Sequence, residues 1–242
     1  MGLHSLESAL SMKFEIKYGP TFSILEFRLD ADELVIAQPN SMLSMTAGIK
    51  LRARAGRSGT RGGGGLLGGM KSMLGGENFF TAEFYTRRSD QTLMLAPDAY
   101  GDILTIQLAD SNGFFLTRGS YLASFGECEL RIKYGGVKGV MAKTGLFLLH
   151  AEGEGTVFCQ TYGAIVEHEL AEGEHFFVDN KYVVAFSTAV QYQLVKATES
   201  VKDSLFSGEG LINRFTGPGK VFYQSRAKPS ESWLARIIGA AT

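Results

Sequence analysis

One short apolar pair recurs three times at a constant spacing, and this repeat constrains the fold more than any other feature of the chain. Leu93-Met94, Val157-Phe158 and Val221-Phe222 follow one another at intervals of 64 residues. A small polar turn is predicted before each pair, at residues 89–92, 153–156 and 217–220. A fixed period of this kind indicates one supersecondary unit used three times, with each copy leaning on its neighbour to bury an apolar face.

Strand signals dominate the rest of the chain. Short runs rich in Phe, Tyr, Val, Ile and Leu are bounded by Gly, Asn, Asp or Pro, which is typical of strands joined by tight turns. The clearest predicted strands are 22–28, 33–37, 103–108, 113–117, 146–150, 175–178 and 182–187. Helical periodicity is nearly absent before the C-terminus, so we expect an all-β fold made of three short double-stranded β-helix units.

Each unit also carries a turn that leads into a further strand, at residues 39–40, 118–119 and 179–180. Asn and Gly in these turns tolerate the positive φ angles that hairpins require. Aligning the strands that follow on Met45, Phe125 and Phe186 gives intervals of 80 and 61 residues, so the first unit contains an insertion. We predict a single domain with units at 13–97, 98–163 and 164–227, followed by a helical tail at 228–242 that docks on the domain and carries Trp233.

The insertion is a glycine-rich segment, residues 56–76. Four successive glycines at 62–65 favour a flexible loop, and five large apolar residues follow them at spacings typical of a short helix. These residues are Leu66, Leu67, Met70, Met73 and Leu74. Met70 separates the Gly and Lys that a phosphate-binding loop requires to be adjacent, so we interpret the segment as a loop that contacts a partner or a membrane.

Composition narrows the class of protein. Apolar residues make up 45% and charged residues 20% of the 242 residues, which is ordinary for a folded globular chain. A net charge of −1 argues against a surface built as a whole to neutralise nucleic-acid phosphates. Only Cys128 and Cys159 are present, too few for a disulfide framework or a four-ligand zinc site, and we expect both to be buried thiols. We therefore expect a cytoplasmic protein without a cofactor.

Two alternatives rest on particular side chains. His150, His168 and His175 are candidates for the imidazole cluster of a cupin-like metalloenzyme, although their spacing does not match that pattern. Lysines adjacent to tyrosines, as in Lys17-Tyr18 and Lys181-Tyr182, also occur on surfaces that bind single-stranded nucleic acids.

A resemblance to a known family rests on a combination of motifs. The segments that carry it are residues 68–80, Leu95-Ala-Pro97, 101–104 and 215–222. With these motifs the chain resembles, from about Lys13 to Arg226, the uncharacterised proteins grouped with the altered-inheritance-of-mitochondria protein, whose eukaryotic members are linked to mitochondrial biogenesis.

The resemblance implies a fold similar to that of the trp RNA-binding attenuation protein, in which three chains of three units close into a ring of nine. It implies no catalytic residue. Where the family tends to have a Pro-Gly turn in the first unit, this chain has Arg87-Arg88-Ser89-Asp90, so a uniform groove around the ring is not expected. We predict a homotrimeric, non-enzymatic binding or scaffold protein, with an RNA-binding ring and a metalloenzyme as the alternatives.

Overall fold

A computed structural model describes residues 12–56, 79–109, 111–117, 119–134, 147–196 and 211–228. The described residues form seventeen strands and no helix, and every paired strand in them is antiparallel to its neighbour. The all-β prediction is confirmed. The predicted tail at 228–242 lies outside the described residues except for Lys228, and the proposed unit boundaries stay a prediction.

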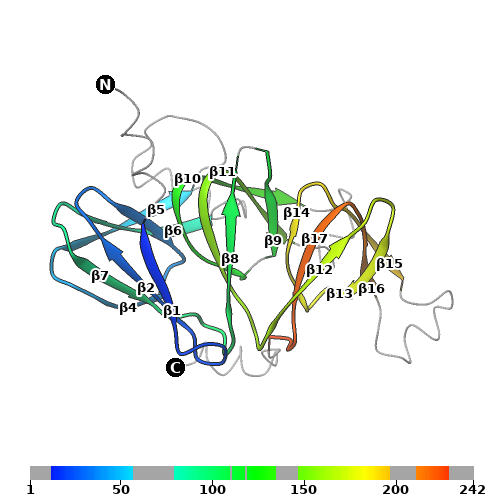
Figure 1. The fold of residues 1–242 in the computed structure, drawn as a ribbon, viewed down its shortest axis with the longest axis horizontal. Helices are drawn as coiled ribbons and strands as arrows, with labels where there is room; N and C mark the ends of the chain where they lie inside the picture. The colour runs from blue at the N-terminus through cyan, green and yellow to red at the C-terminus, as the bar shows by residue number, and fades with distance from the viewer. Residues whose placement is uncertain are drawn as a thin grey trace, which may run out of the picture.

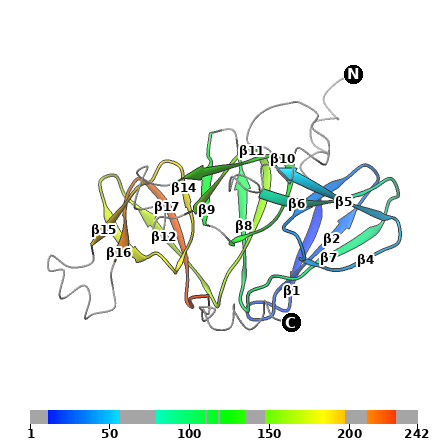
Figure 2. The ribbon, with the colours of Figure 1, turned by 180° about the vertical axis from the view of Figure 1, so that it is seen from behind.

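The strands form three sheets. The first has the order β1 (Lys13–Lys17), β2 (Ile24–Leu29), β7 (Gln91–Leu95) and β4 (Met42–Met45). The third has the order β13 (His175–Asp179), β16 (Leu211–Thr216) and β15 (Gln191–Lys196). These two small sheets occupy opposite ends of the elongated molecule (Figures 1 and 2).

The second sheet has ten strands and joins the two ends. Its order is β12 (Ile165–Leu170), β17 (Gly219–Gln224), β14 (Val183–Ser187), β9 (Phe114–Thr117), β11 (Phe147–Gln160), β10 (Tyr121–Tyr134), β3 (Leu34–Ala37), β6 (Phe79–Thr86) and β5 (Ile49–Gly56). Strand β8 (Ile103–Leu108) pairs with β11 beside this path.

Alternating residues explain the local strand structure. In β2, Leu25, Phe27 and Leu29 are fully buried on one face, as the period of two in a strand requires. Glu26 points to the other face and is also buried, because Lys17 of β1 covers it with an ion pair at 2.8 Å. Strand β1 therefore shields a carboxylate that would otherwise face water at the edge of the first sheet.

Three strand pairs share one irregularity. In β4–β7, β10–β11 and β14–β17 the register skips one residue of the first strand at the same step. We call the three skipped residues, Leu43, Leu122 and Val184, the bulge residues. Two positions after each bulge residue come Met45, Ser124 and Phe186, which lie opposite Leu93, Val157 and Val221.

The observed register corrects the predicted alignment. Ser124, and not Phe125, corresponds to Met45 and Phe186, so the intervals are 79 and 62 residues. The sequence favoured Phe125 because it is aromatic like Phe186. Pairing across the strands decides the register instead, since the bulge shifts each following residue by one position.

The turn predicted at 153–156 is also wrong. Strand β11 runs through this segment without interruption and pairs with β10 on both sides of it. Gly153 and Gly126 have φ angles of 100° and 86°, values that side chains with a Cβ rarely adopt. The glycines allow the long β10–β11 ribbon to bend, so one ribbon serves both the β8 pairing and the β9 pairing.

Aromatic rings connect the first sheet to the second. Phe158 of β11 lies edge-on to Phe14 at 4.8 Å and to Phe27 at 5.5 Å between ring centroids, and Phe125 of β10 closes the group. Such pairs contribute about 0.5–1.5 kcal/mol each beyond the burial of their area. The first two predicted units therefore share a core rather than only a linker.

Candidate functional site: two uncovered sheet edges

Two strand junctions within the chain follow one rule. Strand β3 pairs with β10 so that Ala37 lies opposite Ala123, and strand β9 pairs with β14 so that Leu116 lies opposite Ala185. In each case the first residue lies six positions before a bulge residue and its partner lies directly after the next bulge residue along the chain. Each junction joins one predicted unit to the next.

These junctions bury the bulge residues. Leu122 is fully buried in a core cluster that includes Leu25 and Phe27 of the first sheet. Val184 is 1% exposed and packs in the cluster that contains Leu116 of β9. An apolar bulge residue is thus enclosed wherever the preceding unit supplies a covering strand.

Strand β4 has no such cover. Its only strand neighbour among the described residues is β7, and its residues are all exposed. The bulge residue Leu43 is 54% exposed, and its neighbours Met42 and Met45 are 41% and 38% exposed. An edge strand with three large apolar side chains and no charge lacks the features that normally prevent edge pairing.

Strand β13 is the matching uncovered strand. It pairs with β16 alone, whereas its counterparts β3 and β9 each pair with a second strand as well. Phe177 lies seven residues before Val184, as Phe115 lies seven before Leu122. Phe115 packs on Phe186 at 5.4 Å, but Phe177 is 52% exposed. The two uncovered edges therefore have complementary positions, one at each end of the molecule (Figure 1).

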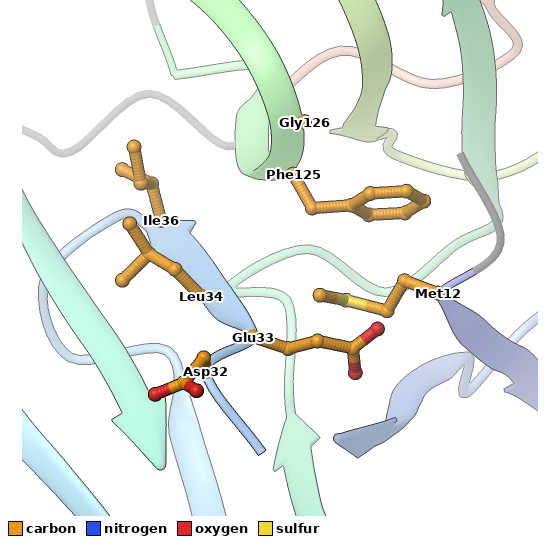
Figure 3. A pocket seen from close by; sticks show the side chains of 7 residues that line it. All are labelled: Met12, Asp32, Glu33, Leu34, Ile36, Phe125 and Gly126. Atoms are coloured by element: carbon orange, nitrogen blue, oxygen red, sulfur yellow. The ribbon is translucent and has the colours of Figure 1, made fainter. Parts of the chain in front are cut away.

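A hollow of about 260 Å³ lies beside the β3–β10 junction (Figure 3). Its apolar wall is formed by Met12, Leu34, Ile36 and Phe125, and Asp32, Glu33 and Gly126 complete the lining. One carboxylate oxygen of Glu33 accepts the Asp30 backbone N–H at 2.7 Å, so this acid is held by its own turn. The hollow combines an apolar wall with two acids and holds no basic or nucleophilic side chain among these lining residues.

The predicted contact loop, Leu66, Leu67, Met70, Met73 and Leu74, lies outside the described residues. The contact made by this segment stays a prediction.

The histidines of the metalloenzyme alternative have separate surroundings. His150 packs on the ring of Phe115 at 5.0 Å, and His175 lies 3.0 Å from the Thr216 hydroxyl. His168 stacks on Phe176 at 4.1 Å and lies 3.3 Å from Glu174. Over the part of the chain that the structure describes, no three His, Cys, Asp or Glu side chains gather as metal ligands.

The lysines adjacent to tyrosines are paired with carboxylates. Lys17 lies 2.8 Å from Glu26, and Lys181 lies 3.0 Å from Asp179 and 5.2 Å from the centre of the Tyr182 ring. A lysine already neutralised in this way contributes little to phosphate binding. These contacts do not favour the RNA-binding alternative.

Both thiols are shielded, as expected. Burial raises the pKa of Cys159 to about 12 and that of Cys128 to about 11. Cys159 is fully buried, and Cys128 is partly buried with its Sγ 3.2 Å from the Phe125 carbonyl oxygen. Thiols with raised pKa values are poor nucleophiles, so neither marks a reactive site.

The described strands define an all-β protein of antiparallel sheets. Within that class, the chain belongs to the mitochondrial biogenesis AIM24 family, whose model matches residues 14–226. An uncharacterized protein of Streptococcus pyogenes serotype M6 is 30% identical over 217 residues, which cover 88% of this chain and 86% of the relative. The crystal structure of a Streptococcus pyogenes protein, 28% identical, matches with a TM-score of 0.71 and covers 95% of this chain and 98% of its own.

The sequence did not reveal the uncovered edges. The available signal was the uncharged run Met42-Leu43-Ser44-Met45, which resembles a core strand in composition. Among the described residues, no helix is long and apolar enough to cross a membrane.

Proposed function

We propose that the protein is a non-enzymatic, ring-forming binding or scaffold protein in which β13 of one copy pairs with β4 of the next. The observation that supports this most is the exposure of Leu43, whose two counterparts in the chain are both buried. The junctions inside the chain supply the register: Val178 lies opposite Ser44, and Phe177 lies opposite Met45 of the next copy. Phe177 then packs as Phe115 packs on Phe186.

The two edges differ from each other, so the interface is heterologous. Heterologous interfaces form closed rings when the rotation between copies closes, and open filaments when it does not. Closure removes every uncovered β13 and β4 edge, which is a physical reason to favour the ring. The number of copies, three, and the nine-unit arrangement like that of the trp RNA-binding attenuation protein follow from the family resemblance.

The glycine-rich segment gives such a ring a means of attachment. Each copy contributes the apolar residues between Leu66 and Leu74, so three copies present three contact loops and bind with higher avidity than one. Deleting residues 61–75 is expected to leave the oligomer intact and to abolish association with vesicles or with a partner. Unchanged association would mean that the loop is not the contact.

Native mass spectrometry of the whole protein tests the assembly. A species of three chain masses is expected, with no ladder of larger species. A monomer at micromolar concentration, or an open series of masses, would contradict the proposed ring. Electron microscopy of the same sample distinguishes a closed ring from a compact trimer of another geometry.

A further inference from the structure

Three exposed aromatic residues lie close together in sequence and space at turns outside the strands. Tyr18 is 73%, Phe22 68% and Tyr100 74% exposed, and the ring of Phe22 lies edge-on to that of Tyr100 at 6.4 Å between centroids. We call Tyr18, Phe22 and Tyr100 the aromatic patch. Exposed apolar groups gathered in this way mark a surface that something covers.

The described chain ends close to this patch. The Arg226 N–H donates to the Tyr162 carbonyl oxygen at 3.1 Å, and the next N–H, of Gly163, donates to the Tyr100 carbonyl oxygen at 2.9 Å. Arg226 and Tyr100 are therefore bound to adjacent residues of one segment. Two strand spacings of about 4.8 Å separate their backbones by roughly 10 Å.

The fourteen residues after Lys228 are long enough to cover the patch. As a helix they span about 21 Å, and in an extended form more than twice that length. Trp233, Leu234, Ile237 and Ile238 recur at the spacing of one helical face, and Glu231 and Arg236 are the only acidic and basic side chains of the segment. The segment thus has a narrow apolar stripe that needs an apolar surface within reach.

We propose that residues 229–242 dock on the aromatic patch of the same chain, with Trp233 and its apolar neighbours against Phe22 and Tyr100. The patch provides the exposed rings, the end of the described chain provides the reach, and the segment provides the matching apolar residues. Docking covers the rings of Phe22 and Tyr100 without using either sheet edge of the proposed ring.

Trp233 is the only tryptophan of the chain, so its fluorescence reports directly on the docking. In the full-length protein its emission is expected at shorter wavelength than that of free N-acetyltryptophanamide, with several-fold weaker quenching by acrylamide. The double variant Phe22→Ser/Tyr100→Ser is expected to shift the emission to longer wavelength and restore strong quenching. Leu51→Ser, which changes another exposed apolar residue on β5, is the matched control and is expected to leave both signals unchanged.

A second measurement covers variants that fold poorly. A synthetic peptide of residues 229–242 is added to a protein that ends at Lys228, and its emission is expected to move to shorter wavelength. The same truncation carrying Tyr100→Ser is expected to lose this shift. Full quenching of Trp233 in the intact protein, or shielding that survives Phe22→Ser/Tyr100→Ser, would overturn the proposal. So would shielding that appears only when lipid vesicles are added.

Discussion

Leu43 and Leu122 occupy the same position in two strand pairs of identical register, and only Leu122 is buried. The difference lies in cover, because β3 pairs with β10 beside Leu122 and no strand in the described ranges pairs with the second edge of β4. The third bulge residue, Val184, is covered like Leu122. In the proposed ring, Leu43 gains the same enclosure from β13 of the neighbouring copy.

A charge at Leu43 is expected to prevent assembly. Leu43→Lys places an unpaired ammonium in the proposed interface core, which costs about 2 kcal/mol or more and weakens each interface about thirtyfold. The variant should sediment as a monomer at concentrations where the natural sequence assembles. Leu51→Lys introduces the same charge at an exposed leucine of β5, 48% exposed, and is expected to keep the full mass. An assembled Leu43→Lys protein would rule out the β4 interface.

Phe177 and Phe115 are expected to separate assembly from folding. Phe177→Ala removes an exposed ring, so the free energy of unfolding of the single chain should change little while association weakens. Phe115→Ala removes a half-buried ring that packs on Phe186 and His150, and should lower the free energy of unfolding by about 2 kcal/mol. Denaturant titration of dilute samples measures folding, and analytical ultracentrifugation measures association. Equal effects of the two substitutions on both quantities would contradict the assignment of β13.

The strands could be predicted because their signals are local. Alternation and bounding turns place β8 at 103–108 in both the prediction and the structure, and β3 and β9 within one residue. The 64-residue spacing also survives, since Met94, Phe158 and Phe222 all follow the bulge step in their pairs. These features depend on neighbours in sequence, which a single chain records.

The kink and the uncovered edges could not be predicted in the same way. Gly153-Glu154-Gly155 has the composition of a turn, and only the continuous pairing of β11 with β10 turns it into a bend. Likewise Met42 to Met45 look like a buried strand, because composition is the same whether the cover comes from the chain itself or from another copy. Strand order across a sheet decides both cases, and it is a property of the folded chain.

Gly153 should be far less tolerant of substitution than Gly119. Both have positive φ angles, 100° and 86°, so alanine costs about 1–2 kcal/mol of backbone strain at either position. A Cβ at Gly153 would also overlap the Glu127 carbonyl oxygen, whereas a Cβ at Gly119 meets no atom within 4 Å. Gly153→Ala is therefore expected to lower the free energy of unfolding by clearly more than Gly119→Ala, measured by urea titration. Similar losses would show that the ribbon bends without needing this glycine.

Burial of Cys159 predicts a loss of stability at alkaline pH. Its folded-state pKa of about 12 lies above its ordinary value of 9.0, so above pH 9 the unfolded chain releases a proton that the folded chain keeps. The contribution is therefore fully present below pH 9 and is lost as the pH rises toward 12, at up to about 1.4 kcal/mol per pH unit. Cys159→Ala should show a shallower fall than the natural sequence between pH 9 and 10.5 in urea titrations, while Cys128 and Tyr121 contribute to both proteins. Parallel curves would mean that the thiol ionises as easily in the folded chain as in the unfolded one.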